Sequence, residues 1–174
     1  MQNDHELIKL FQNGDHKSYD RLVRRHLSNT VGFFYTITRD KMVAEDLAQD
    51  VFFKLFKNLN KFRFKSAFST YLYRINLNTA NSWFTRNKWK NFLHLDQAVD
   101  QHRVDKNLEK NWLSKELWDA ISKLPQKQRS VVVMRIAKEL PYKEISTVTG
   151  MSEGAAKVNF HHALQTLKEV LNED

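Results

Sequence analysis

Residues 51–95 read VFFKLFKNLNKFRFKSAFSTYLYRINLNTANSWFTRNKWKNFLHL. This stretch contains nine Lys and Arg side chains and no Asp or Glu, and it holds 12 of the chain's 21 aromatic residues. Cations interleaved with flat rings are what a protein needs to hold a phosphate backbone while it stacks unpaired bases. We therefore expect the stretch to bind single-stranded or melted nucleic acid. The alternative, in which most of the rings form the core of a helical bundle, does not explain why the acids are missing.

Glycine and proline, which interrupt regular structure, are rare in this chain. There are four glycines and two prolines, and neither type occurs between Gly32 and Pro125. Strand-like alternation of apolar and polar residues is equally scarce, so the sequence predicts an all-α fold. A chain of 174 residues can form one domain or two small ones, and it can bury a core in either case.

Four helices are expected in the N-terminal half. They cover about residues 6–13, where Gly14 ends the first helix, residues 16–38, a third helix capped by Asp40, and residues 69–90 after a break near residues 60–66. Apolar residues at steps of three and four predict the buried face of the third helix. They are Ala44, Leu47, Val51, Leu55 and Leu59.

The second half begins with a segment in which helical periodicity fades. Residues 93–111 alternate in charge, and we interpret them as a flexible linker between a domain of residues 1–92 and a domain of residues 112–174. A continuous polar helix is the alternative. Four further helices are expected in the second domain: one with Leu113, Leu117, Ile121 and Leu124 on one face, one over residues 126–138, one opened by Pro141, and one that begins at Ser152.

The last two of these helices have the pattern of a helix-turn-helix. Ile145 and Val148 form an apolar edge, Gly150 permits a left-handed turn, and Ser152 can cap the next helix. Placed in a major groove, that helix would direct five polar side chains at bases or phosphates. They are Ser152, Glu153, Lys157, Asn159 and His161. A plain helical hairpin is the alternative interpretation.

An acidic patch precedes the basic stretch. Asp46 and Asp50 lie one helical turn apart with Gln49 beside them, and no His at helical spacing joins them to complete a metal site or an acid–base pair. A patch of this sign on an otherwise basic domain suits a protein partner better than DNA, although a solvated helix face is the simpler interpretation. The sequence shows no phosphate loop or nucleophile motif, so we expect no catalysis, no metal and no cofactor.

The net charge of +8 is unevenly spread. Residues 1–92 carry 16 Lys and Arg against 8 Asp and Glu, whereas the rest of the chain carries equal numbers of each sign. This asymmetry favours a polyanion as partner of the first half, most plausibly nucleic acid, over a generic basic surface. The absence of cysteine excludes disulfides and thiolate metal sites. With no run of 18 apolar residues and no signal-peptide pattern, we expect no membrane insertion and a cytoplasmic location.

Four segments together resemble the extracytoplasmic-function (ECF) sigma factors, a compact class of initiation subunits of bacterial RNA polymerase. In chain order they are residues 44–52 (AEDLAQDVF), residues 67–75 (AFSTYLYRI), residues 124–129 (LPQKQR) and the helix-turn-helix. The resemblance implies that the protein binds core polymerase and directs it to promoters. The implied contacts with the clamp of the largest polymerase subunit are Asp46, Gln49, Asp50 and Phe53.

Roles in promoter binding are also implied by the resemblance. The segment from Phe62 to Trp83 would read and melt the −10 element, and Asn78 would pocket a flipped non-template base from a loop or helix start, which would break the long helix near it. The implied contacts are Arg63, Lys65, Phe68, Tyr71, Arg74, Asn78, Asn81, Trp83, Arg86 and Lys88. The helix-turn-helix would read the −35 element as duplex, and an anti-sigma factor would be a further partner.

The chain departs from the family pattern in two places. Arg74 and Ile75 stand where larger sigma factors tend to have paired tryptophans, so a single flipped base is the expected melting device. Asn159, His162 and Leu164 occupy positions that are often arginine in similar proteins. Fewer fixed cations predict weaker phosphate anchoring and a shallower salt dependence for the C-terminal domain.

Two other functions fit parts of the sequence. A helix-turn-helix regulator with a helical sensor domain would bind operator duplex without polymerase, and it would have little use for residues 51–95. An RNA- or single-strand-binding module would use residues 51–95 and make the C-terminal unit redundant. An enzyme built on Asp46 and Asp50 is a third possibility, which the missing partner residues argue against.

Overall fold

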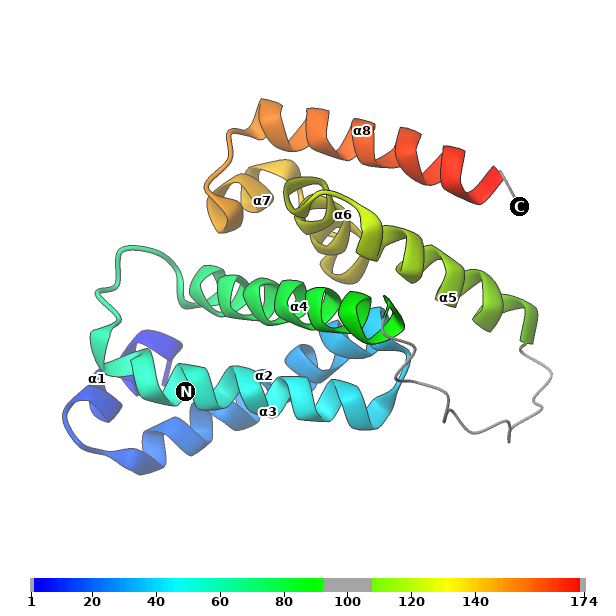
Figure 1. Ribbon diagram of the computed structural model, residues 1–174. Coiled ribbons are helices and arrows are strands. Elements are labelled where there is room, and N and C mark those ends of the chain that lie inside the picture. Colours follow the sequence, from blue (N-terminus) through cyan, green and yellow to red (C-terminus); the bar gives the residue numbers. More distant parts are fainter. Residues whose placement is uncertain (1, 93–107, 173–174) are drawn as a thin grey trace.

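The computed structural model of the protein describes residues 2–92 and 108–172 (Figure 1). In these two ranges the chain forms helices and no strand, which confirms the predicted all-α fold. The elements are α1 (Asp4–Gln12), α2 (His16–Thr38), α3 (Lys41–Asn58), the short 3₁₀-helix η1 (Leu59–Lys61), α4 (Phe68–Phe92), α5 (Leu108–Lys123), α6 (Gln126–Lys138), α7 (Tyr142–Thr149) and α8 (Glu153–Asn172). None of the helices so described is both long and apolar enough to cross a bilayer.

The N-terminal unit is built on the pair α2 and α3, with α1 packed on α2 and α4 packed on α3. The predicted apolar stripe of α3 is buried along its whole length, from Ala44 to Leu59. Asp40 caps α3 as expected, because its side-chain oxygen accepts the backbone N–H of Val43 at 3.1 Å. The largest side chains of the core in this unit include Phe33 and Phe34, whose rings meet edge to face at 5.0 Å.

Helix α1 begins two residues earlier than the apolar pattern predicts. Asn3 accepts the backbone N–H of Glu6 at 2.9 Å, and the Glu6 carboxylate accepts the backbone N–H of Asn3 at 3.0 Å. This reciprocal capping box satisfies two N–H groups that have no partner within the helix, so the helix extends to Asp4. At the other end, the backbone of Gly14 is left-handed, with φ 98°, and the chain turns there as predicted.

Helix α4 is continuous from Phe68 to Phe92, so the expected break near Asn78 is wrong. No glycine or proline lies in this range, and Asn78 occupies an ordinary position within the helix. The break between α3 and α4 is where the sequence predicts it. It consists of η1 and residues 62–67, which have no helical backbone.

The C-terminal unit begins with α5 at Leu108, so residues 108–111 belong to a helix and not to the predicted linker. Residues 93–107 of that linker lie outside the described residues. Gly150 ends α7 with φ 77°, and the Ser152 hydroxyl accepts the backbone N–H of Ala155 at 3.1 Å at the start of α8. The predicted turn between two helices is therefore confirmed, and the apolar edge of α7 is buried at Ile145 and Val148.

The two units pack against each other, with α4 between the N-terminal helices and the C-terminal helices (Figure 1). Helix α4 contacts α5, α6 and α7, and α2 contacts α6. The rings of Phe84 in α4 and Trp118 in α5 are stacked at 6.3 Å. Lys138 of α6 donates to the backbone oxygen of Asn29 in α2 at 2.7 Å, and its burial lowers its pKa. Side chains of α4 that face the C-terminal unit are thereby partly covered by it.

Candidate polymerase and promoter interfaces

The first candidate surface is the exposed face of α3. Asp46, Gln49 and Asp50 are exposed there, and Phe53 follows one turn later with 60% of its side chain exposed. The Lys57 ammonium lies over the Phe53 ring, 4.1 Å from its centroid. This face carries two carboxylates and an unburied ring on one side of a single rigid helix, as predicted for a protein-binding surface.

Beside this face runs an apolar groove between α2 and α3. It is lined by Tyr19, Asp20, Val23, Arg24, Leu27, Gln49, Phe52, Phe53 and Phe56. Leu27 and Phe56 are 41% and 43% exposed and line the same groove, so they form a contiguous apolar patch. The groove and the acidic face share Gln49 and Phe53, so one partner can cover both. An apolar floor with a charged rim is the usual composition of a protein–protein interface.

The rigidity of the groove depends on Tyr19. Its hydroxyl donates to the backbone oxygen of Phe52 at 2.5 Å, which ties α2 to α3. Burial raises the pKa of Tyr19 well above its ordinary value. The rings of Phe11, Tyr19 and Phe56 meet at 5.1–5.5 Å, so the wall of the groove is packed through to α1.

The second candidate surface includes the loop of residues 62–67. Arg63 and Lys65 are exposed on this loop, whereas Phe62 is buried and Phe64 is half-buried. The Phe64 backbone has φ 56°, a left-handed conformation that is uncommon for a bulky residue. The loop thus turns its rings inward and its cations outward, which places two positive charges where a phosphate backbone can reach them.

Helix α4 continues this surface. The residues predicted to contact DNA from this helix differ in how exposed they are. Arg74, Asn78 and Arg86 are exposed, and Tyr71 and Trp83 are half-buried. The side chain of Lys88 lies outside the described residues. Burial of Tyr71 raises the pKa of its phenol, so the ring is already partly dehydrated.

Phe68 requires a correction. Only 3% of its side chain is exposed, and its ring meets His26 at 5.2 Å and Phe62 at 6.3 Å, both edge to face. Phe52, Phe62 and Phe84 are buried as well. These rings belong to the core, as the alternative interpretation of the basic stretch requires, so Phe68 cannot stack a base in this structure. The exposed side chains of the loop and of the described part of α4 are mainly cations and amides.

A cleft lies where α4 meets the C-terminal unit. Arg74, Leu77, Asn78 and Asn81 line one wall, and Gln126, Lys127, Ser130 and residues 148–151 line the other. The Arg74 guanidinium donates to the backbone oxygens of Val148 at 2.9 Å and Thr147 at 2.6 Å. Asn78 remains exposed at the mouth of this cleft. Arg74 is therefore engaged with the end of α7 in the arrangement described.

Asn81 is 8% exposed and forms part of a buried network that the sequence did not predict. Its amide donates to the Ser130 hydroxyl at 3.2 Å, and its oxygen accepts from Arg129 Nε at 3.0 Å. Arg129 also donates to the backbone oxygen of Ser122 at 2.9 Å and lies 5.4 Å from the centroid of the Phe84 ring. Its burial lowers its pKa. Asn81 is thus an interdomain contact in this structure, and DNA cannot reach it while the network is closed.

The third candidate surface is the start of α8. Lys157 forms an ion pair with Glu153 at 3.0 Å, and the Asn159 amide donates to the backbone oxygen of Ala155 at 2.8 Å. Ser152 is occupied as the helix cap, and His161 is exposed. The five residues lie in the cap and first half of α8, but Asn159 is half-buried, with its amide nitrogen also 3.9 Å from Met151 Sδ. Most of them are, however, already engaged with neighbours on the same helix.

The sequence matches two families of known proteins. The family model for sigma-70 region 2 matches residues 22–90, and the model for sigma-70 region 4 matches residues 114–167. The RNA polymerase sigma-E factor of Streptomyces antibioticus is 32% identical over 132 residues, which is 76% of this chain and 72% of that protein. The chain belongs to the extracytoplasmic-function sigma factors.

Other relatives cover nearly the whole of this sigma factor. The RNA polymerase sigma-H factor of Pseudomonas aeruginosa is 26% identical, over 98% of this chain and 94% of its own length. The ECF RNA polymerase sigma-E factor of Haemophilus influenzae is 27% identical over 95% and 93%. Among solved structures, CnrH in complex with the cytosolic domain of CnrY has a TM-score of 0.64 at 21% identity, covering 97% of this chain and 96% of that one. That likeness supports the fold.

Regions 2 and 4 of this sigma factor correspond to the two units of the structure. Region 2 contains the acidic face of α3, the loop and most of α4, and region 4 contains the helix-turn-helix. Helix α1 lies before the region 2 match. Within the described residues, no three side chains of the types that bind metals converge on one point.

Proposed function

We propose that this sigma factor divides its work between three surfaces. The acidic face of α3 and the adjoining groove bind the clamp of core RNA polymerase, the loop and α4 hold the opened non-template strand at the −10 element, and α8 reads the −35 element as duplex. The observation that carries this proposal is the separation of charge within one rigid unit. Asp46 and Asp50 lie exposed on α3, whereas Arg63 and Lys65 lie exposed on the loop after η1. Opposite charges on separate elements suit a protein partner and a nucleic acid at the same time.

Promoter opening on this surface needs no cofactor. Stacking of a base on an aromatic ring contributes about 1–3 kcal/mol, which is comparable to the few kcal/mol needed to unstack one base. Asn78 is exposed on α4 and presents an amide that can donate to and accept from a base edge. Trp83 and Tyr71, half-buried on the same helix, offer ring edges and partial faces. With Phe68 in the core, we assign capture of the base to the Asn78 amide together with partial stacking on Tyr71 and Trp83.

The arrangement described is a closed one. Arg74 is bonded to the end of α7, and Asn81 is bonded to α6. Both residues were expected to contact DNA, so the proposal requires the C-terminal unit to move away from α4 when the holoenzyme binds a promoter. The strand would then replace the two backbone carbonyls as partner of the Arg74 guanidinium. A guanidinium binds phosphate with two parallel hydrogen bonds, which favours this exchange.

An anti-sigma factor is the proposed partner of the closed form. One similar structure is described as a complex of CnrH with the cytosolic domain of CnrY, and another as the sigma factor RpoE of Bartonella quintana with the anti-sigma factor NepR. The second has a TM-score of 0.56 at 20% identity. We propose that a partner of this kind covers both units of the present chain and stabilises their contact. Its action, like that of the polymerase, would take place in the cytoplasm.

Run-off transcription tests the proposed function. Purified core polymerase is incubated with a promoter library, with and without the chain, and the transcripts are sequenced. We expect defined start sites only when the chain is present. A helix-turn-helix regulator would bind duplex without polymerase and produce no start sites, and a single-strand-binding module would bind DNA or RNA without selecting promoters. Either of these results would overturn the proposal.

A further inference from the structure

The loop of residues 62–67 is held by a helix outside the region 2 match. The side-chain amide of Gln12, the last residue of α1, donates to the backbone oxygens of Leu59 and Phe62, both at 3.0 Å. These two acceptors mark the start of η1 and the start of the loop, 47 and 50 residues away in sequence. One amide therefore uses both of its N–H groups to fix the backbone just before Arg63.

The same helix supports the loop through its rings. The Phe64 ring packs edge to face against His5 at 5.1 Å and against Phe62 at 5.0 Å, and the Lys9 ammonium lies 5.8 Å from its centroid. These contacts hold Phe64 in its left-handed backbone conformation, which is unfavourable for a bulky residue in isolation. With Phe64 turned inward, its two neighbours Arg63 and Lys65 point outward.

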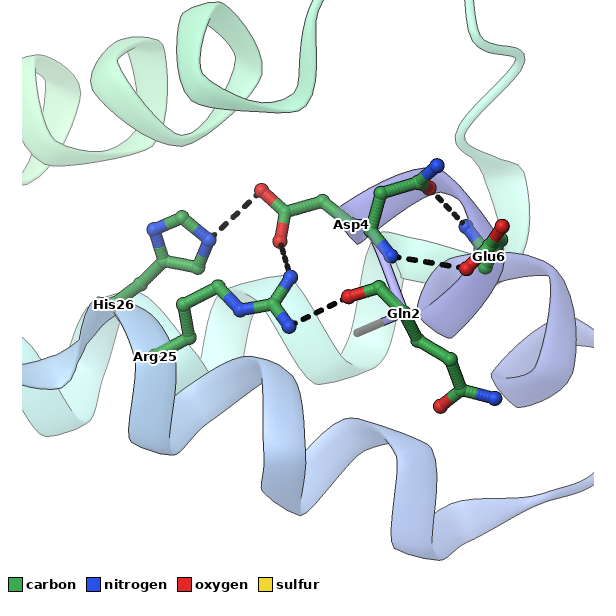
Figure 2. Close-up of polar contacts among 6 residues, drawn as sticks. Gln2, Asp4, Glu6, Arg25 and His26 are labelled. Carbon is green, nitrogen blue, oxygen red and sulfur yellow. Dashed lines mark hydrogen bonds and ion pairs between the residues drawn. The ribbon is translucent and has the colours of Figure 1, made fainter.

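Helix α1 is itself anchored at its other end. The carboxylate of Asp4 accepts from Arg25 Nη1 at 2.6 Å and contacts His26 Nε2 at 2.9 Å (Figure 2). Arg25 Nη2 also donates to the backbone oxygen of Gln2 at 2.7 Å, as Figure 2 shows. The first residue of α1 is thus bound to α2, and the last residue of α1 is bound to the loop. Helix α1 therefore connects α2 to the loop through contacts at both of its ends.

We propose that Gln12 is a positioning residue for promoter opening: through α1 it holds the loop in the conformation that presents Arg63 and Lys65 to the opened strand. This inference rests on the proposed function, because it assigns a partner to the loop cations. Gln12 itself is only part-exposed and lies beneath the loop, so it acts through the loop backbone. Its contribution should therefore vanish once the two cations are absent.

A double-mutant cycle tests this inference. The variants are Gln12→Met, which keeps the side-chain length but removes both N–H donors, the pair Arg63→Ala with Lys65→Ala, and all three changes together. Each is assembled with core polymerase, and binding of the non-template strand of a promoter selected by run-off transcription is measured at several salt concentrations, with core polymerase alone as the blank. We expect Gln12→Met to weaken binding about three- to tenfold. It should also lower the salt slope by up to ~1.4, because each of the two cations that no longer reaches a single-strand phosphate lowers it by ~0.7.

The triple variant decides the result. If Gln12 acts through the cations, the triple variant binds as the Arg63→Ala, Lys65→Ala pair does, because coupled residues are not additive. If the triple variant is weakened by the product of the two separate factors, or if Gln12→Met leaves binding and salt slope unchanged, the inference is overturned while the proposed function stands. If wild-type holoenzyme starts no transcript on any promoter, both are overturned.

Asn60→Asp is the matched control. Asn60 is exposed on η1, two residues before the loop, and the change adds a negative charge there while the Gln12 amide keeps its acceptors, the backbone oxygens of Leu59 and Phe62. We expect Asn60→Asp to weaken strand binding by electrostatic repulsion and to do so with and without Arg63→Ala and Lys65→Ala, because repulsion of a phosphate does not require these cations. A cycle for Asn60 that shows the same complete coupling as the cycle for Gln12 would overturn the positioning role.

Discussion

The two units of this sigma factor use their cations in different ways. In the N-terminal unit, Arg63, Lys65 and Arg86 are exposed along the loop and α4. In the C-terminal unit, Arg129 lies in the buried network with Asn81 and Lys157 is paired with Glu153, while Lys123, Lys127, Lys143 and Lys168 are exposed. The net charges of the two halves of the sequence also differ, because the excess of Lys and Arg falls entirely within residues 1–92.

Arg135 in α6 is likewise engaged within the C-terminal unit. It donates to the backbone oxygen of Leu140 at 2.8 Å, and its guanidinium lies 5.0 Å from the Tyr142 ring centroid. A cation used to hold a helix end contributes less to the capture of a phosphate backbone, because it must first leave its partner. We therefore expect region 2 to supply most of the electrostatic binding of DNA. We expect region 4 to read the duplex mainly through the fit of α8 to the major groove.

Assembly with polymerase should depend on region 2 alone. Asp50→Lys reverses a charge on the exposed face of α3, and we expect it to weaken binding of core polymerase about 10- to 100-fold, because like charges across an interface cost several kcal/mol. Fluorescence anisotropy of the labelled chain titrated with core polymerase measures this. Glu169→Lys makes a matched charge reversal on the exposed side of α8 and should leave the affinity unchanged. Equal decreases in affinity in both variants would remove the distinction between the two units.

Promoter opening should depend on Asn78. Replacing it with Ala removes an exposed amide from α4, and we expect opening to slow about tenfold, the equivalent of ~1.4 kcal/mol, with core binding intact. The fluorescence of 2-aminopurine placed in the −10 element follows the rate. Ser82→Ala, one turn further along α4, removes only a hydroxyl bonded to the backbone oxygen of Asn78 and serves as the control. Identical opening rates in the two variants would rule out the assignment of Asn78.

Local sequence signals predicted much of this fold. Asp40, Gly150 and Ser152 determine helix boundaries through bonds and backbone angles within a few residues, and each acts as expected. The buried stripe of α3 was also predictable, because its apolar residues recur with the period of an α-helix. The capping box at Asn3 was the missed local signal, since an Asn three residues before a Glu marks such a helix start.

Contacts between distant residues account for the errors at the site. Phe68 and Tyr71 look alike in sequence, yet Phe68 faces His26 and Phe62 in the core, because orientation on α4 depends on which helices cover it. Asn81 and Arg129 are 48 residues apart, and Gln12 and Phe62 are 50 apart. One sequence by itself carries no signal of such pairs. Arg129 did belong to the motif of residues 124–129, but nothing in that motif indicates where its guanidinium binds.

The contribution of region 4 to DNA affinity should be small and adjustable. Lys157→Ala should lower the salt slope for duplex binding by less than the ~0.9 expected for a full phosphate contact, because the Lys157 ammonium already has a partner in Glu153. Glu153→Gln releases that ammonium and should tighten non-specific duplex binding about two- to threefold. Filter binding of −35 duplex at several salt concentrations measures both. The alternative result is a decrease of ~0.9 in the salt slope of Lys157→Ala with no gain in affinity in Glu153→Gln. It would show that the ion pair between Lys157 and Glu153 breaks on DNA without loss of binding free energy.

Alkaline pH should affect region 2 through Tyr19. Burial raises the pKa of Tyr19 above the ordinary value of 10.0, so the unfolded chain ionises this phenol at a pH where the folded chain keeps it neutral. The stabilisation is therefore complete below pH 10 and is lost as the pH rises above that value. Tyr19→Phe removes the donor to Phe52 and should cost about 1 kcal/mol in the free energy of unfolding at neutral pH. Urea unfolding of both proteins at several pH values measures this difference.

Above pH 10 the difference between wild type and Tyr19→Phe should shrink, because the wild type then loses the advantage that the variant never had. Hydrogen exchange locates the part of the fold that alkali loosens. A gap between the two proteins that stays constant across that range would mean that the phenol ionises as easily in the folded groove as in the unfolded chain. If α8 loses protection first, alkali unfolds region 4 before region 2. The packing of α2 on α3 would then not be the part of the fold that depends on a neutral Tyr19.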